Sequence, residues 1–132
     1  QPDKDEVKVI RMSEVYLIAA EAAYQTGNEA LALEYLNDVA TERDATFAGY
    51  SSSGANLLND ILLERRKELA FEGHRYWDLQ RYNLPVTRVN LAGNYTGVPL
   101  TIAPTSFRRI LPIPQAELDA NPNIRGQQNT GY

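Results

Sequence analysis

Hydrophobic residues recur at helical spacing along the first stretch of the chain, from Arg11 onward. The apolar positions that trace one face of this expected helix are Met12, Val15, Tyr16, Ala19, Ala22 and Ala23. Gly27 stands where the helix should end, because a residue without a Cβ readily takes the left-handed conformation found after helices. Asn28 is a favourable N-cap for a second helix. The pattern therefore predicts an antiparallel helical hairpin with a very short connection.

The expected second helix carries an apolar face of its own, made of Ala32, Leu36, Val39 and Ala40. Six positions of the hairpin also keep the spacing of a tetratricopeptide repeat, in which small residues let two helices approach closely. These positions are Tyr16, Ala20, Gly27, Ala32, Leu36 and Val39. A single repeat cannot bury its own face. Further helices are therefore expected to pack beside the pair.

A third apolar row begins near Leu57, and we expect the rest of the chain to be arranged around it. Its members at helical spacing are Leu58, Ile61, Leu62 and Leu69, with Arg65 on the same stripe. Gly73 is expected to end this helix. A second run of bulky residues follows at once and stops at Leu84–Pro85; it contains Tyr76, Trp77, Leu79 and Tyr82.

Two segments of the chain have no helical periodicity. Residues 45–56 are rich in Gly and Ser, and we interpret them as a plain connector rather than a binding element. From Val86 to Thr105, β-branched residues are interrupted by Gly and Pro, which predicts short extended pieces and turns. Asn94 and Tyr95 fall at an expected loop tip there. An exposed aromatic ring beside a polar side chain could bind a sugar, although an ordinary turn is the favoured interpretation.

The last part of the chain is expected to be loop-rich. Arg108–Pro114 is interpreted as a short extended stretch, because its prolines forbid a helix. Glu117–Ala120 should form one helical turn, and Asn123–Tyr132 should be coil pinned to the body. The expected fold class is mainly α, with tetratricopeptide-like antiparallel helical pairs and short extended segments near the C-terminus. We expect one domain over residues 1–132, helical over 10–84 and loop-rich over 85–132.

Charged residues are threaded through the central helical region, and two interpretations compete. Glu64, Glu68 and Glu72 are spaced four apart, so they could form a carboxylate row for acid–base chemistry or a metal. Alternatively, an arginine neutralises each acid and the set fixes the angle between two packed helices. The structural interpretation is favoured, with nearby cations available at Arg65, Lys67 and Arg75. An open hollow with uncompensated glutamates aimed into it would contradict this interpretation.

The remaining chemistry is sparse. His74 is the only histidine and cysteine is absent, so neither a His-Glu-His zinc site nor thiol chemistry can be built from these residues. A glycosidase would need two carboxyl groups facing each other across a bond, whereas acids on one helix row point the same way. The net charge of -4 disfavours general affinity for nucleic acid. The sequence therefore indicates a non-enzymatic protein without a metal site or cofactor.

Three segments, in sequence order, resemble the C-terminal region of the SusD/RagB family of outer-membrane nutrient-binding lipoproteins. They are RMSEVYLIAAEA, ILLERRKELAFEGHRYWDLQRY, and RRILPIPQAELDANPN followed by QNTGY. The central segment is similar to the family's most recognisable pattern. The residues that match this pattern are Arg65, Glu68, Glu72, Gly73, Arg75 and Asp78. They transfer as a structural motif, and no glycan-binding residue can be carried over from the motifs.

The resemblance implies a function as well as a fold. Family members are largely helical, lie on the outward-facing surface of the outer membrane, and are held there by an N-terminal lipid. They capture glycans, or in some cases peptides, and pass them to a SusC-like TonB-dependent transporter without covalent chemistry. The chain is therefore expected to be a piece of a longer protein, whose lipid anchor would lie in the missing N-terminal part. A scaffold whose main role is to dock the transporter is the alternative.

Overall fold

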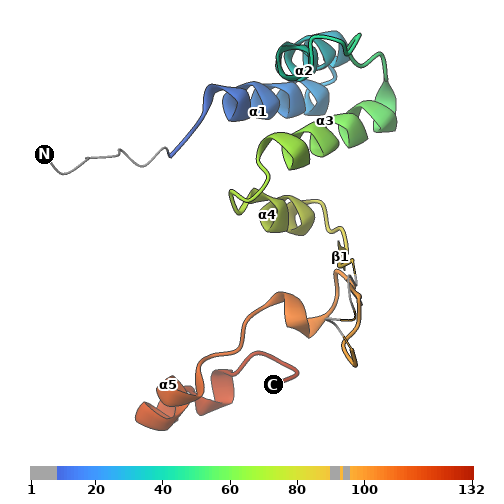
Figure 1. The fold of residues 1–132 in the computed structure, drawn as a ribbon. Helices are drawn as coiled ribbons and strands as arrows, with labels where there is room; N and C mark the ends of the chain where they lie inside the picture. The colour runs from blue at the N-terminus through green and yellow to red at the C-terminus, as the bar shows by residue number, and fades with distance from the viewer. Residues whose placement is uncertain (1–8, 90–92, 94–95) are drawn as a thin grey trace, which may run out of the picture. The chain divides into compact units, whose positions relative to one another are not determined.

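The structure, a computed structural model, describes residues 9–89, 93 and 96–132. Contacts between residues divide the chain into two compact units. The first ends at Arg75, and the second is Tyr76–Tyr132. Figure 1 shows that helices dominate the first unit, whereas the second combines short helices with irregular segments. The mainly α fold class predicted from the sequence is thereby confirmed.

Three helices build the first unit: α1 (Met12–Gln25), α2 (Glu29–Arg43) and α3 (Gly54–Glu68). Helices α1 and α2 form the predicted hairpin, and α3 packs against both. The junction between α1 and α2 has the conformation that Gly27 and Asn28 predict. Gly27 has a φ of 83°, and the amide of Asn28 donates to the carbonyl of Ala23 at 2.9 Å. The side chain of Asn28 caps α2 by accepting from the Leu31 amide at 3.3 Å.

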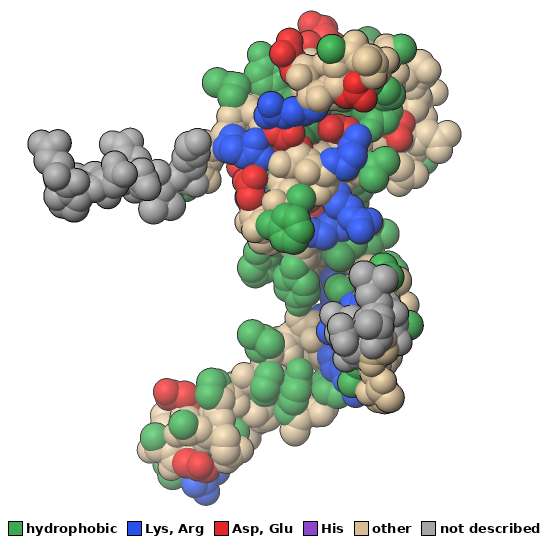
Figure 2. All heavy atoms as spheres, in the orientation of Figure 1, with side chains coloured by type: hydrophobic (Ala, Val, Ile, Leu, Met, Phe, Trp, Pro, Cys, Tyr) green, Lys and Arg blue, Asp and Glu red, His purple; other side chains and the backbone are tan. Residues whose placement is uncertain are grey.

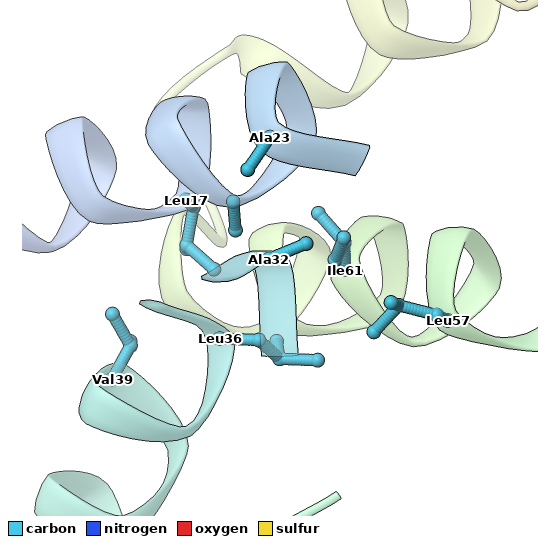
Figure 3. Close-up of a cluster of buried hydrophobic side chains, with 8 residues drawn as sticks. Leu17, Ala23, Ala32, Leu36, Val39, Leu57 and Ile61 are labelled. Carbon is cyan, nitrogen blue, oxygen red and sulfur yellow. The ribbon is translucent and has the colours of Figure 1, made fainter. Parts of the chain in front are cut away.

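The core of the first unit lies where the three helices cross (Figure 3). Its buried members are Leu17, Ala20, Ala23, Ala32, Leu36, Val39, Leu57 and Ile61. Alanines at the crossing leave room for close approach of the backbones, and leucines fill the space between them. The predicted face of α2 is confirmed, because all four of its expected apolar residues are buried.

The predicted face of α1 was only partly right. Met12 is 70% exposed and Val15 is also exposed. Ala23 is buried as predicted, but the other buried residues of the helix are Leu17 and Ala20, which the predicted face did not include. Alanines occur on both sides of this helix and therefore define two possible rows. The bulky Leu17, which is fully buried, decides which row faces the core.

Helix α3 buries most of its predicted stripe, including Arg65, but its ends differ from the prediction. It begins at Gly54, before the apolar row, and it ends at Glu68 with Leu69 as its C-cap. Gly73 therefore does not end α3; it lies in the following turn, immediately before α4 (His74–Arg81). Two residues of this turn are left-handed, Phe71 with a φ of 66° and Gly73 with a φ of 83°.

A small sheet lies among the described residues of the second unit. Strand β1 (Val86–Thr87) pairs antiparallel with β2 (Thr101–Ile102), with Val86 opposite Ile102. These strands are the short extended pieces that the β-branched pattern predicted. Asn94 and Tyr95 lie outside the described residues, so their proposed part in ligand binding stays a prediction.

The closing segment is more helical than predicted. Arg108 and Arg109 lie in a 3-10 turn (Phe107–Arg109), because the Ser106 side chain caps it by accepting from the Arg108 amide at 3.3 Å. The extended conformation starts only at Ile110. The predicted helical turn is present as α5 (Gln115–Ala120), with Asn121 as its C-cap. Part of the expected coil, residues 122–127, forms a 3-10 helix.

The tail is pinned to the body, as expected, by contacts with residues 107–113. The side-chain amide of Gln128 accepts from the Ile113 amide at 2.8 Å and donates to its carbonyl at 3.1 Å. The Tyr132 hydroxyl donates to the Ile110 carbonyl at 3.1 Å, and its ring meets the edge of Phe107 with centroids 5.1 Å apart. These hydrogen bonds therefore hold the C-terminal tail against residues 110–113, which lie 15 to 22 positions earlier in the sequence.

Candidate functional site

Arg11, which directly precedes α1, joins the start of that helix to the end of α3. Its guanidinium donates to Glu68 Oε1 at 2.6 Å, to the Glu68 carbonyl at 2.5 Å and to Glu72 Oε1 at 2.8 Å. It also donates to Ser13 Oγ at 3.0 Å. A planar guanidinium with five donors can serve several acceptors at once. One side chain therefore neutralises two of the three glutamates that the sequence singled out.

Glu68 receives a second cation from the last turn of α2. Arg43 donates to Glu68 through Nε at 2.9 Å and Nη2 at 2.7 Å, a two-pronged contact with both carboxylate oxygens. The Glu68 side chain is only 6% exposed. Hydrogen bonds from Arg43, Ser13 and Arg11 outweigh burial and lower the pKa of Glu68 to about 2. Such a carboxylate is ionised at neutral pH and cannot act there as a general acid.

Glu64 is compensated by a separate pair of groups. The Tyr50 hydroxyl donates to Glu64 Oε2 at 2.8 Å, and Lys67 forms an ion pair with the same oxygen. Lys67 also donates to the Tyr50 hydroxyl at 3.0 Å. Burial and the neighbouring Glu64 carboxylate raise the pKa of the Tyr50 phenol, which therefore keeps its proton at neutral pH. The result is a closed triangle of three polar side chains.

These pairs form a charged corner on the first unit, composed of Arg11, Arg43, Glu64, Lys67, Glu68 and Glu72. Figure 2 shows basic and acidic side chains interleaved on this unit. Two hollows flank the corner, and Arg43 lines both. One, of about 520 Å³, is lined by Met12, Ser13, Tyr16, Asp38, Val39, Thr41, Glu42 and Arg43. The other, of about 440 Å³, is lined by Ala40, Arg43, Asp44, Phe47, Tyr50, Glu64, Lys67 and Glu68.

The corner tests the interpretation of the acids directly. A hollow does open beside Glu64 and Glu68, yet both carboxylates are paired with cations. The cations for Glu68 and Glu72 are Arg11 and Arg43, which sequence reasoning missed. They lie 57 and 25 positions from Glu68, so no local spacing could reveal them. Lys67 was named from the sequence and is found in this role beside Glu64.

The other charged residues of the motif lie in α3 and α4. Arg65 and Asp78 are buried, and Arg75 is half-buried. Arg81 donates to Asp78 Oδ1 at 2.9 Å, one turn along α4. His74 begins α4 and its Nδ1 lies 3.6 Å from Glu14 Oε1. The purely structural role of the motif is consistent with these positions and remains a prediction.

A buried arginine in the second unit was not singled out from the sequence. Arg109 donates to the Leu84 carbonyl at 2.5 Å and to Gln80 Oε1 at 2.9 Å. The Tyr76 hydroxyl donates to the backbone carbonyl of Arg109. Arg109 therefore ties the 3-10 turn to α4 and to Leu84 in the segment after that helix. The only signal in the sequence was an arginine that directly precedes an apolar run, which does not identify its partners.

Within the described ranges, no three acidic or histidine side chains gather in a way that could hold a metal ion. The described helices are all too short or too polar to cross a membrane.

Comparison with known proteins decides the family. The sequence model of the SusD family matches residues 2–132. The chain belongs to the SusD family. The resemblance noted from its three motifs is thereby confirmed.

Relatives of this SusD-family chain include proteins of known structure. It is 34% identical to a SusD superfamily protein from Bacteroides vulgatus, with a TM-score of 0.74 over 94% of this chain. A SusD superfamily protein from Bacteroides thetaiotaomicron is 38% identical, with a TM-score of 0.72 over 92% of this chain. SusD-like protein P25 from Formosa agariphila is 33% identical over 94% of this chain. The chain spans 24% of P25 and 27% of each solved structure, about a quarter of their length.

Proposed function

We propose that this SusD-family chain is part of a non-catalytic, cell-surface glycan-binding protein of a nutrient-uptake system. The observation that carries the proposal is the family match over residues 2–132. In this proposal the longer protein is a lipoprotein on the outward-facing surface of the outer membrane. It captures an oligosaccharide and passes it to a SusC-like TonB-dependent transporter.

The charged corner supports a binding role rather than a catalytic one. Glycoside hydrolysis needs one carboxylic acid that is protonated at the working pH. Glu68 is held ionised by two arginines, and Glu64 is held by Lys67 and Tyr50. These acids stabilise the helical framework, and the motif residues around Gly73 have the same structural task.

A direct test measures oligosaccharide binding and hydrolysis by the full-length protein together. Titration calorimetry with a panel of oligosaccharides should show saturable binding, and incubation with the bound sugar should release no shorter products. Binding of peptides in place of glycans would assign the protein to peptide capture. Turnover that disappears in Glu68→Gln while folding is retained would contradict the non-catalytic role.

The transporter partnership has a separate test. The full-length protein should co-purify with a TonB-dependent transporter from native outer membranes. Loss of co-purification after deletion of residues 9–75, with glycan binding unchanged, would favour the alternative in which this region is mainly a docking scaffold.

A further inference from the structure

The hollow between the end of α2 and the loop that follows it combines aromatic rings with fixed polar groups. Phe47 is 37% exposed, and its ring meets Tyr50 edge to face with centroids 5.0 Å apart. The volume of about 440 Å³ lies within the range of small-molecule sites. An accessible ring with polar side chains around it can stack on the apolar face of a sugar while those side chains bond its hydroxyls.

The loop that carries both rings is held rigidly on α2. The Tyr50 amide donates to Asn37 Oδ1 at 2.6 Å, and Asn37 Nδ2 donates to the Tyr50 carbonyl at 3.0 Å. Gly49 packs so closely on Asn37 that an added Cβ would lie 3.0 Å from its Oδ1. Asp44 fixes the other end of the loop by accepting from the Thr46 amide at 2.9 Å. A rigid loop loses little conformational freedom when a ligand binds.

The polar groups of the hollow are also held in place, and their charges nearly balance. Arg43 and Lys67 are each more than half exposed, although each is paired with a buried glutamate. The lining contains two cations and three carboxylates, and Arg11 adds a further cation to Glu68. A strongly charged ligand would therefore find no net opposite charge. A neutral ligand with many hydroxyl groups would find fixed donors and acceptors.

We infer that this hollow is a subsite for a neutral sugar residue, with Phe47 as its stacking platform. The inference rests on the proposed function and extends it to a location in this chain. It also gives Phe47 and Tyr50, which lie within residues 45–56, a binding role that the connector interpretation did not.

A site-specific reporter tests the subsite. Phe47→Trp in the full-length protein, produced with 5-fluorotryptophan, adds one fluorine resonance at the hollow. The probes are neutral di- and trisaccharides of glucose, mannose and galactose. The added resonance should shift saturably with at least one probe. The matched control is Phe71→Trp, which replaces a fully exposed aromatic outside the hollow and whose added resonance should not move.

A second variant supplies an affinity measurement that does not depend on the reporter. Phe47→Ala should weaken binding of the same probe roughly threefold to tenfold, as expected for loss of one aromatic contact. Phe71→Ala should leave the affinity unchanged. Suppose that the wild-type protein binds a probe, but the resonance added by Phe47→Trp does not move and Phe47→Ala binds the probe as tightly as wild type. The proposed subsite is then wrong, and the proposed function stands. Absence of wild-type binding to any sugar contradicts both.

Discussion

Single residues hold the charged corner together, and Glu68 is the most connected of them. Its carboxylate accepts from Arg11 and Arg43 and is almost completely buried, so removing its charge takes away the anion that Arg43 pairs with and one of the two that Arg11 pairs with. Glu68→Gln should therefore lower the free energy of unfolding by about 2–4 kcal/mol. Thermal unfolding of the variant and wild type at pH 7 measures this loss. Glu42→Gln, on exposed α2 surface, is the control and should change stability by less than about 0.5 kcal/mol.

The lowered pKa of Glu68 also predicts how stability depends on pH. Because the folded-state pKa is about 2 and the ordinary value is 4.5, the stabilisation is fully present above pH 4.5. It is lost progressively as the pH falls from 4.5 toward 2, since the unfolded state then binds the proton more readily. Melting curves across this range should show a steeper loss for wild type than for Glu68→Gln. Parallel curves would contradict the assignment.

Arg109 is the corresponding residue in the second unit. Arg109→Met keeps much of the buried side-chain volume but removes the donor to the Leu84 carbonyl and to the Gln80 side-chain oxygen Oε1. The expected loss is about 2–3 kcal/mol. Arg108→Met, at the exposed neighbouring position, should have little effect. Equal melting temperatures for the Arg109→Met protein and wild type would show that these bonds are not stabilising.

At the scale of elements, packing of the α1–α2 hairpin on α3 depends on Leu36, which is fully buried. Leu36→Ala removes its methyl groups and leaves a cavity among three helices. The cost should be about 2–5 kcal/mol. The matched control is Leu63→Ala on the exposed side of α3, which should cost much less. Chemical denaturation of both variants compares them directly, and equal losses would contradict the observed core.

The elements also show which sequence signals were sufficient. Gly27 and Asn28 defined the hairpin junction because their effects act through the local backbone. The helix end predicted at Gly73 was wrong, because the left-handed conformation of a glycine occurs in turns as well as at helix ends. The phase of α1 could not be read from its alanines, since small residues fit either a core or a surface row.

At the scale of the whole molecule, the ion-pair and hydrogen-bond partners of charged side chains were not predicted where the two residues are distant in the sequence. The three glutamates and the family motif identified the charged corner, yet Arg11 reaches it from the residue before α1 and Arg43 from the end of α2. Arg109 and Gln80 likewise lie 29 positions apart. Periodicity and spacing describe neighbours along one element, so such pairs become visible only when the elements are packed.

The uneven distribution of buried side chains predicts an uneven distribution of stability. The apolar core cluster belongs to α1, α2 and α3, whereas α5 contributes one buried residue, Leu118. Amide hydrogen exchange should therefore be slowest in the three long helices and faster in α5 and the residues after it. Mass spectrometry of exchanged peptides from the full-length protein measures this order. Equal protection in α2 and α5 would contradict it.

The tail contacts have a consequence for synthesis of the protein. Residues 110–113 find partners at Gln128 and Tyr132, so they cannot reach their final conformation until translation has passed Tyr132. Until then, Ile110 and Leu111 belong to a segment of the nascent chain that has been translated but has not reached its folded conformation. A ribosome that stalls a few codons before Tyr132 should therefore release a product that is a substrate for chaperones and proteases.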